Sequence, residues 1–212
     1  MKLNLSADEV LTTTRAVRKR LDFDKPVPRE VITECLEVAL QAPTGSNSQG
    51  WQWMFVDDPA KKLAIRDFYK KYFEDYSKHS REWAEGDPRA AQKPGVRSSA
   101  EFLAENFHRV PVLMIPLIEG RLDNASVFEG AGAWGSLLPA VWSFMLALRE
   151  RGLGSAWTTL HLPAEKEVAE LLGIPYEKYT QGGLFPVAYT IGTDFKPAKR
   201  MPAEQFIHWN TF

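Results

Sequence analysis

The chain has 212 residues and a mass of 24.0 kDa, with 44% hydrophobic and 25% charged residues, a composition that suits one folded domain. Its net charge of −1 and pI near 6.4 leave no basic field of the kind that binds nucleic acid or an anionic membrane. The single cysteine, Cys35, excludes an intrachain disulfide and fits a reducing compartment, so we expect a cytoplasmic protein. The N-terminus lacks the apolar core of a signal peptide, and the run Leu137–Leu148 is shorter than the about 20 residues of a membrane span.

Apolar periodicity and capping signals predict the elements of the first part of the chain. The pair Ser6 and Glu9 has the spacing of a capping box, and Cys35 lies on the apolar face of its helix, where a thiol is inert. In chain order we expect a short helix from Ser6 or Ala7 to about Arg15, a helix over Pro28–Gln41, a strand at Trp51–Val56 and a helix over Pro59–Tyr76.

The stretch His79–Gln92 is hydrophilic and weakly periodic, and with its flanks it predicts a mobile lid or insertion at about residues 77–106. The later elements are a helix at Val96–Asn106, a strand at Val110–Ile118, a loop with a short helix at Glu119–Gly135, a helix at Leu137–Arg151 capped by Ser136, a strand at Ser155–Leu160, a helix at Pro163–Leu172 closed by Gly173, and a strand at Phe185–Gly192. Strands separated by helices predict a mixed α/β arrangement in which helix outweighs strand.

The C-terminal segment ends with four large apolar residues. Because burying each such side chain is worth roughly 1.5–3 kcal/mol, we expect this tail to be covered, and a partner subunit is a plausible place. These residues are Phe206, Ile207, Trp209 and Phe212.

Several familiar motifs are absent or accidental. Residues 130–135, GAGAWG, formally match G-x-G-x-x-G, but no strand precedes them and no acid ends the next strand, so we interpret the match as chance. The four histidines are scattered and no Cys or carboxylate lies at ligand spacing, so no metal site is predicted. A nucleophile elbow and a P-loop are also missing from the sequence.

Two features remain that suit a flat, anionic ligand. The loop Ala42–Trp53, APTGSNSQGWQW, gathers hydrogen-bonding side chains between a predicted helix and a predicted strand. The cluster Arg15–Arg20 carries four cations in six positions, and a second cluster holds Lys196, Lys199 and Arg200. If the chain is helical or turned there, Arg15 and Arg18 are close enough in sequence to meet one anion.

These segments together resemble the nitroreductase family of FMN-dependent oxidoreductases. The resemblance covers nearly the whole chain, from TRAVR, PVPREVI and the loop APTGSNSQGWQW to SLLPAV, GLGSAWTT and GTDFKPAKRMP. It implies an α+β sandwich with a central mixed sheet flanked by helices and an intertwined homodimer with two FMN sites at its interface. It implies one such domain over residues 1–212.

The resemblance also implies the residues that bind FMN. Arg15, Ala16 and Arg18 would meet the phosphate and ribityl chain, and Arg200 would bind the phosphate. The loop would contribute Pro43, Thr44, Gly45, Ser46, Asn47 and Gln49, and the segment before the later helix would place Gly154, Ser155 and Thr158 near the ring system. The sequence departs from the family pattern at Thr14, where Arg is common, at Ala16, where Ser is common, and at Gly50, where Pro is usual.

The function that follows is hydride uptake from NAD(P)H and electron transfer to an organic acceptor, such as a nitroaromatic or quinone, in a ping-pong cycle. Because the flavin performs the chemistry, we expect no protein nucleophile and no essential acid–base residue, and so no catalytic side chain. Two alternatives stay open at this point: reductive dehalogenation or flavin fragmentation on the same fold, and flavin binding without turnover.

Overall fold

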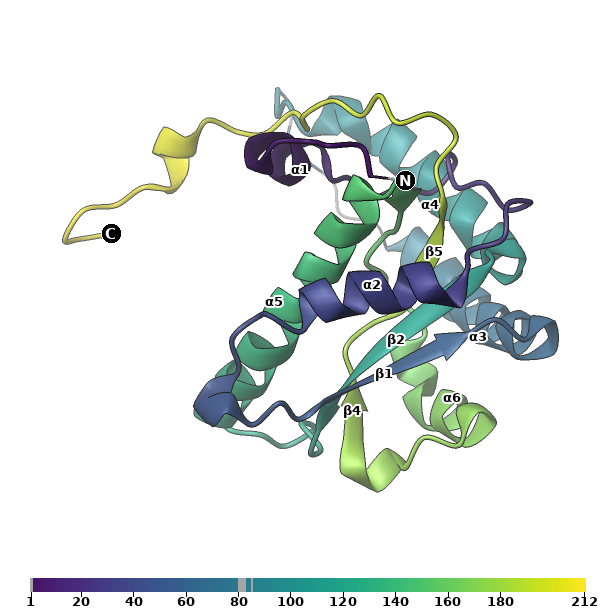
Figure 1. Cartoon of the computed structure of the whole chain (residues 1–212). Coiled ribbons are helices and arrows are strands. Elements are labelled where there is room, and N and C mark those ends of the chain that lie inside the picture. Colours follow the sequence, from purple (N-terminus) through teal and green to yellow (C-terminus); the bar gives the residue numbers. More distant parts are fainter. Residues whose placement is uncertain (1, 80–82, 85) are drawn as a thin grey trace.

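The computed structural model of the chain describes residues 2–79, 83–84 and 86–212, and Figure 1 shows helices packed around a small twisted sheet. The helices are α1 (Ala7–Thr13), α2 (Arg29–Ala39), α3 (Pro59–Lys78), α4 (Lys93–Asn106), α5 (Val127–Glu150) and α6 (Glu165–Leu172). The strands are β1 (Trp51–Val56), β2 (Val112–Glu119), β3 (Leu153–Gly154), β4 (Tyr179–Gln181) and β5 (Phe185–Tyr189).

The sheet has the order β1-β2-β5-β3, with β4 paired to β2, and these strand pairs are antiparallel. The parallel component of the expected mixed sheet is the isolated bridge between Ala16 and Ser155. Strand β2 is buried from Val112 to Ile118 because its alternate residues enter two different core clusters, one on each face of the sheet. The prediction of an α+β fold with a helix-flanked sheet is therefore confirmed.

The longest helix begins well before the expected start at Leu137. Ser126 caps α5 in a reciprocal capping box with Glu129, and the helix then runs without interruption through residues 130–135 and through Pro139. The match to G-x-G-x-x-G thus lies inside a helix, where the backbone amides are already bonded and cannot cradle a phosphate. The interpretation of that match as chance is confirmed. The short helix predicted within Glu119–Gly135 is present, but the structure joins it to the helix predicted from Leu137 in one continuous α5.

Helix α5 is long and apolar enough to cross a membrane, with a mean hydropathy of 1.4 in its most apolar window. Of that window 44% is buried inside the chain, where α5 packs against α2 and the strands β2 and β3. The same length and composition mark the core helix of a globular fold, so they do not by themselves indicate a membrane protein.

Two other predicted elements differ from the structure. The segment Ser155–Leu160 has only two isolated bridges, Ser155 to Ala16 and Thr158 to Leu184, and the true strand β3 lies just before it. Strand β4 was not expected, because three residues are too few to carry a period-2 pattern. By contrast, β1 has the predicted bounds, and Gly173 closes α6 in the left-handed conformation, with φ 71°.

The C-terminal tail leaves the body of the molecule as an extended arm (Figure 1). Phe206, Ile207, Trp209 and Phe212 are all exposed, so the chain itself does not bury them as expected. Residues 80–82 and 85 of the predicted lid lie outside the described residues, and the rest of residues 77–106 consists mainly of the end of α3 and of α4.

Candidate functional site

The two arginines expected to meet one anion face different parts of the molecule. Residues 14–18 are extended rather than helical, and Val17 donates a backbone hydrogen bond of 2.8 Å to the carbonyl of Ser155. Neighbours three apart on an extended segment point to opposite faces. Accordingly, Arg15 donates to the carbonyl of Lys196 at 2.8 Å, whereas Arg18 approaches Ser99 on α4 at 3.5 Å. The expectation that Arg15 and Arg18 share one anion is wrong for this conformation.

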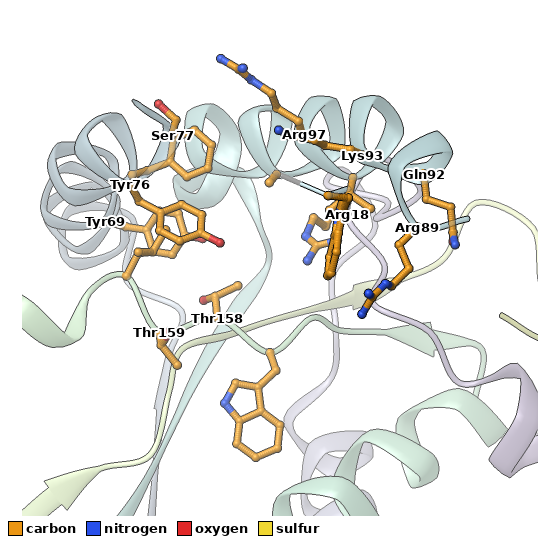
Figure 2. Close-up of a pocket in the computed structure, with 16 residues that line it drawn as sticks. Arg18, Tyr69, Tyr76, Ser77, Arg89, Gln92, Lys93, Arg97, Thr158 and Thr159 are labelled. Carbon is orange, nitrogen blue, oxygen red and sulfur yellow. The ribbon is translucent and has the colours of Figure 1, made fainter. Parts of the chain in front are cut away.

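Arg18 lines a cavity of about 520 Å³ between α3, α4 and the segment that follows β3 (Figure 2). Burial lowers the pKa of its guanidinium, opposed by the nearby Tyr69, and no carboxylate among the described residues contributes to that balance. The walls are largely aromatic and apolar, with further cations on the α4 side. The other lining residues are Tyr69, Phe73, Tyr76, Ser77, Trp83, Arg89, Gln92, Lys93, Val96, Arg97, Ala100, Trp157, Thr158, Thr159 and Leu160.

Thr158 forms the floor of this cavity beneath Arg18 and Tyr69 (Figure 2). Its hydroxyl donates to the carbonyl of Leu184 at 2.5 Å, and its backbone N–H donates to the same carbonyl at 3.2 Å. These two hydrogen bonds fix the Thr158 side chain, because its hydroxyl and its backbone N–H donate to the same carbonyl oxygen. The predicted residues Arg18 and Thr158 are therefore brought to one cavity.

Arg15, Gly154 and Ser155 line a second, much smaller space on the other side of the same segment, of about 10 Å³. The Ser155 hydroxyl is buried there without a hydrogen-bond partner, as is Nη1 of Arg149. Gly154 is required by packing, since a Cβ at this position would lie 2.7 Å from Thr190 and 2.9 Å from Val17. Ala16 connects the two spaces through its bridge to Ser155.

The loop that contains Pro43, Thr44, Gly45, Ser46, Asn47 and Gln49 lies elsewhere. It is joined to α5 by a 2.9 Å bond from the Gly45 N–H to the Ser136 hydroxyl. From Ser136 to Arg149, which lines the small space, α5 extends by roughly 20 Å at about 1.5 Å per residue. Within one chain, the loop thus lies near the middle of α5 and the arginine segment near its C-terminal end.

The loop has a strained and largely exposed backbone. Ser46, Asn47 and Gln49 all take φ values of 51–52°, which non-glycine residues adopt at a cost. The Gln49 amide donates to the Asn47 side-chain oxygen at 3.2 Å, so the two amides hold each other rather than a neighbouring element. Gly50, expected to loosen the loop, has its carbonyl bonded to the N–H of Glu119 at 2.8 Å. A Cβ at Gly50 would lie 3.3 Å from that residue's Cβ, so the two strands meet closely here.

Arg200 lies in the exposed arm and donates only to the neighbouring Lys199 carbonyl, at 3.5 Å. The 2.8 Å bond from Arg15 to the Lys196 carbonyl does bring the start of the second basic cluster to the first. Within the described residues there is no group of three His, Cys, Asp or Glu that could hold a metal ion. Cys35 is fully buried and its pKa is raised to about 11 by burial, as expected of an inert thiol.

Sequence reasoning missed the aromatic residues that build the large cavity. Ile65, Tyr69 and Phe73 form one buried stripe of α3 at helical spacing, and the stripe ends beside the cavity. The sequence signal for the cavity was Tyr69 among the apolar residues of that stripe, because a buried Tyr needs a polar partner for its hydroxyl. Trp157 and Leu160 were included in a predicted strand and were therefore not considered as cavity walls.

A sequence profile of the nitroreductase family matches residues 11–189. The chain belongs to the nitroreductase family. Iodotyrosine deiodinase of Thermotoga neapolitana is 30% identical over 206 residues, covering 95% of this chain and 97% of that protein. An NADH dehydrogenase of Thermus thermophilus is 26% identical over 219 residues, covering 97% and 96%.

Among solved structures, oxidised iodotyrosine deiodinase bound to FMN and 3-iodo-L-tyrosine superposes with a TM-score of 0.73. It is 26% identical, and the match covers 97% of this chain and 99% of that one. The family identified from the sequence is therefore confirmed, and this is a family of FMN-dependent oxidoreductases.

The residues that line the two spaces fit such a cofactor in their chemistry. A flavin mononucleotide requires cations for its phosphate, donors for its pyrimidine edge and apolar cover for its rings. The extended segment supplies Arg15 on one face and Arg18 on the other, on the two sides of the Ala16–Ser155 bridge. Arg18 is half-buried and pairs with no carboxylate in the described part of the chain, and an anionic ligand would compensate its charge.

Proposed function

We propose that this protein binds FMN and transfers electrons from NAD(P)H to a small organic acceptor, such as a quinone or nitroaromatic, in a ping-pong cycle. The observation that carries this proposal is the aromatic-walled cavity that contains the half-buried guanidinium of Arg18 next to Thr158, with no ion pair to a carboxylate of the described residues. When bound, FMN would supply the hydride chemistry, and the chain would supply binding, orientation and exclusion of water.

In this proposal each residue group has its own task. Arg18 stabilises negative charge at the edge of the ring system, and Thr158 fixes the segment against which the rings lie. Arg15 and Arg200 attract the phosphate from the basic end of the molecule. The aromatic walls from α3 and Trp157 surround the bound acceptor with apolar side chains, so that the acceptor takes the place of water in the cavity.

We further propose that the protein is a homodimer whose second subunit provides the loop Pro43–Gln49. The separation of that loop from Arg18 along α5 supports this arrangement, because a single chain does not bring the two together. The exposed arm, with Phe206, Trp209 and Phe212, and the exposed start of α5 at Val127 and Phe128 provide apolar surface for such an interface. We retain the cytoplasm as the predicted compartment.

Anaerobic stopped-flow reduction tests the function. Purified protein reconstituted with FMN should lose its flavin absorbance when mixed with NADH or NADPH, and should recover it on mixing with menadione or a nitrofuran. A protein that neither binds added FMN nor is reduced by either nicotinamide would contradict the proposal.

Reductive dehalogenation is a second candidate, favoured by the 30% identity to iodotyrosine deiodinase over nearly the whole chain. The same reduced protein should be mixed with 3-iodo-L-tyrosine, with iodide and tyrosine as the products to measure. Rapid reoxidation by iodotyrosine and slow reoxidation by menadione would favour this function over the first. A flavin that binds but is never reduced would instead favour a binding protein without turnover.

A further inference from the structure

The phenol of Tyr69 is held rigidly at the wall of the large cavity. Its ring packs on Phe107, with centroids 4.7 Å apart, and stacks on Phe73 at 6.4 Å, so that only 4% of the residue is exposed. It nevertheless lines the cavity, and Figure 2 shows it reaching from α3 toward Thr158. A side chain fixed on both ring faces presents its hydroxyl to the cavity at one place.

The surroundings of this hydroxyl suit a proton donor. Burial raises the pKa of Tyr69 to about 12, against the opposing effects of Arg18 and of the Thr158 hydroxyl, so the phenol is protonated at neutral pH. The Thr158 hydroxyl donates to the Leu184 carbonyl, so it does not itself supply a proton at this wall of the cavity. The Arg18 guanidinium lies close enough to stabilise a phenolate once the proton has left.

The other cavity residues offer few competitors for this role. No Asp, Glu, His or Cys lines the cavity within the described part of the chain. Tyr76 carries the same group but is 59% exposed at the rim, where water takes its place as donor. Arg18 does not release its proton under ordinary conditions, since guanidinium groups remain charged in proteins.

We propose that Tyr69 is a catalytic residue that donates a proton to the oxygen of the bound electron acceptor. The inference rests on the proposed function, in which FMN reduced by NAD(P)H supplies a hydride. When a quinone accepts that hydride, one of its oxygens becomes negatively charged. The O–H bond of Tyr69 then breaks as a new O–H bond forms at this oxygen, which completes the hydroquinone. Water at the open rim returns a proton to the phenolate beside Arg18.

The Tyr69→Phe variant of the FMN-loaded protein tests this role, because it removes the hydroxyl and keeps the ring packing. Tyr72→Phe is the matched control: Tyr72 lies on the same helix, bonds the Pro163 carbonyl at 3.5 Å and does not line the cavity. Turnover with menadione should fall by about 100-fold in Tyr69→Phe, the order typical of a lost general acid. Turnover with ferricyanide, which takes electrons without a proton, should stay within about twofold.

A binding measurement gives a readout independent of turnover. Acetophenone has the carbonyl acceptor but is not reduced, and its dissociation constant for the oxidised protein should rise by about fivefold in Tyr69→Phe, as for one lost hydrogen bond. The control should leave that constant unchanged.

Three results would overturn the proposal. Equal losses with menadione and ferricyanide would indicate a structural role, and an unchanged menadione rate would show that another donor acts. Weaker FMN binding or slower reduction by NAD(P)H in Tyr69→Phe would place the hydroxyl against the flavin instead. If the unmodified protein reduces neither acceptor, the proposed function itself fails, and this outcome is distinct from the other three.

Discussion

At the scale of single residues, the division of labour between Arg15 and Arg18 follows from the conformation of their segment. A helix would have placed both guanidiniums on one face, whereas the extended segment sends Arg15 to the Lys196 carbonyl and Arg18 to the large cavity. The bridge of Ala16 to Ser155 enforces the extended form. One consequence is that Arg18 carries a half-buried charge without an ion pair to any carboxylate of the described residues, which costs stability unless a ligand anion is present.

The variant Arg18→Gln tests whether Arg18 serves a ligand rather than the fold. Burial lowers the pKa of Arg18, which means that the charged guanidinium is less favourable in the folded chain than in the unfolded chain. The apoprotein should therefore be as stable as the unmodified protein, or more stable, when this charge is removed. The dissociation constant for FMN should rise by at least about tenfold, since a charge-assisted contact is lost.

Thermal unfolding of the apoprotein and fluorescence titration with FMN measure these two effects. Arg29→Gln is the control, because Arg29 is exposed and pairs with Asp57 at 2.6 Å, away from the cavity. A destabilised Arg18→Gln apoprotein that still binds FMN normally would contradict the assignment.

His161 makes the stability of the fold depend on pH. The imidazole is fully buried, its Nε2 lies 3.1 Å from the Gln181 side-chain oxygen, and its Nδ1 has no partner. Burial lowers the pKa of His161 from 6.5 to about 4, so the unfolded chain gains a proton between these values while the folded chain does not. Stability is therefore complete above pH 6.5 and is lost as the pH falls toward 4.

Urea unfolding at about pH 7.5 and about pH 5 should show a loss of about 2 kcal/mol that belongs to His161. The variant His161→Gln keeps a polar group for Gln181 but cannot titrate, so its loss between the two pH values should be smaller by that amount. His79→Gln, at an exposed position, should retain the full loss. The same pH dependence in all three proteins would contradict this assignment.

At the scale of elements, prediction from sequence succeeded where local signals and burial agreed. The strand Trp51–Val56 is bounded by Gly50 and Asp57, and α6 is stopped by Gly173, so pattern and punctuation coincide. It failed over α5, where a short helix and a second helix capped by Ser136 were expected instead of one continuous helix. The Ser126–Glu129 capping box starts the helix, and its buried residues begin only at Ser136. The aromatic cavity was not predictable, since it depends on how α3, α4 and the segment after β3 meet.

The two capping boxes of the chain allow an internally controlled test of α5. Ser126→Ala removes the side chain that accepts the Glu129 N–H, and the loss should be about 1 kcal/mol because α5 is part of the core. That corresponds to a melting temperature lower by about 2–4 °C for a chain of this size.

The control is Ser6→Ala, which removes the same motif from α1. Helix α1 has seven residues and none of them is buried, so its fraying should leave global unfolding nearly unchanged. Calorimetry on both variants distinguishes the cases. Equal effects at the two caps would mean that α5 does not begin at Val127 in solution.

At the scale of the whole molecule, the predicted FMN-binding residues form two groups separated by roughly 20 Å along α5. Arg15, Arg18 and Thr158 lie together, while Gly45 and its loop are fixed to Ser136. A two-fold symmetric dimer can bring one subunit's loop to the other subunit's arginines, because each interface residue then occurs twice. The sequence could name both groups through the family resemblance, but it could not show that they are apart within one chain.

Mixing two inactive variants decides whether one site draws on two chains. Arg18→Gln damages the arginine group, and Asn47→Ala damages the loop. If each site combines Arg18 of one subunit with Asn47 of the other, a mixed dimer contains one site with both changes and one site with neither.

Refolding the two variants together in equal amounts makes about half of the dimers mixed, so about a quarter of the sites regain normal FMN affinity and turnover. If both residues served the same site within one chain, every site in the mixture would carry a change and no activity would return. Recovery of activity therefore requires that the loop of one subunit and Arg18 of the other form one site. The separation of the loop and Arg18 along α5 within one chain leads us to expect this recovery.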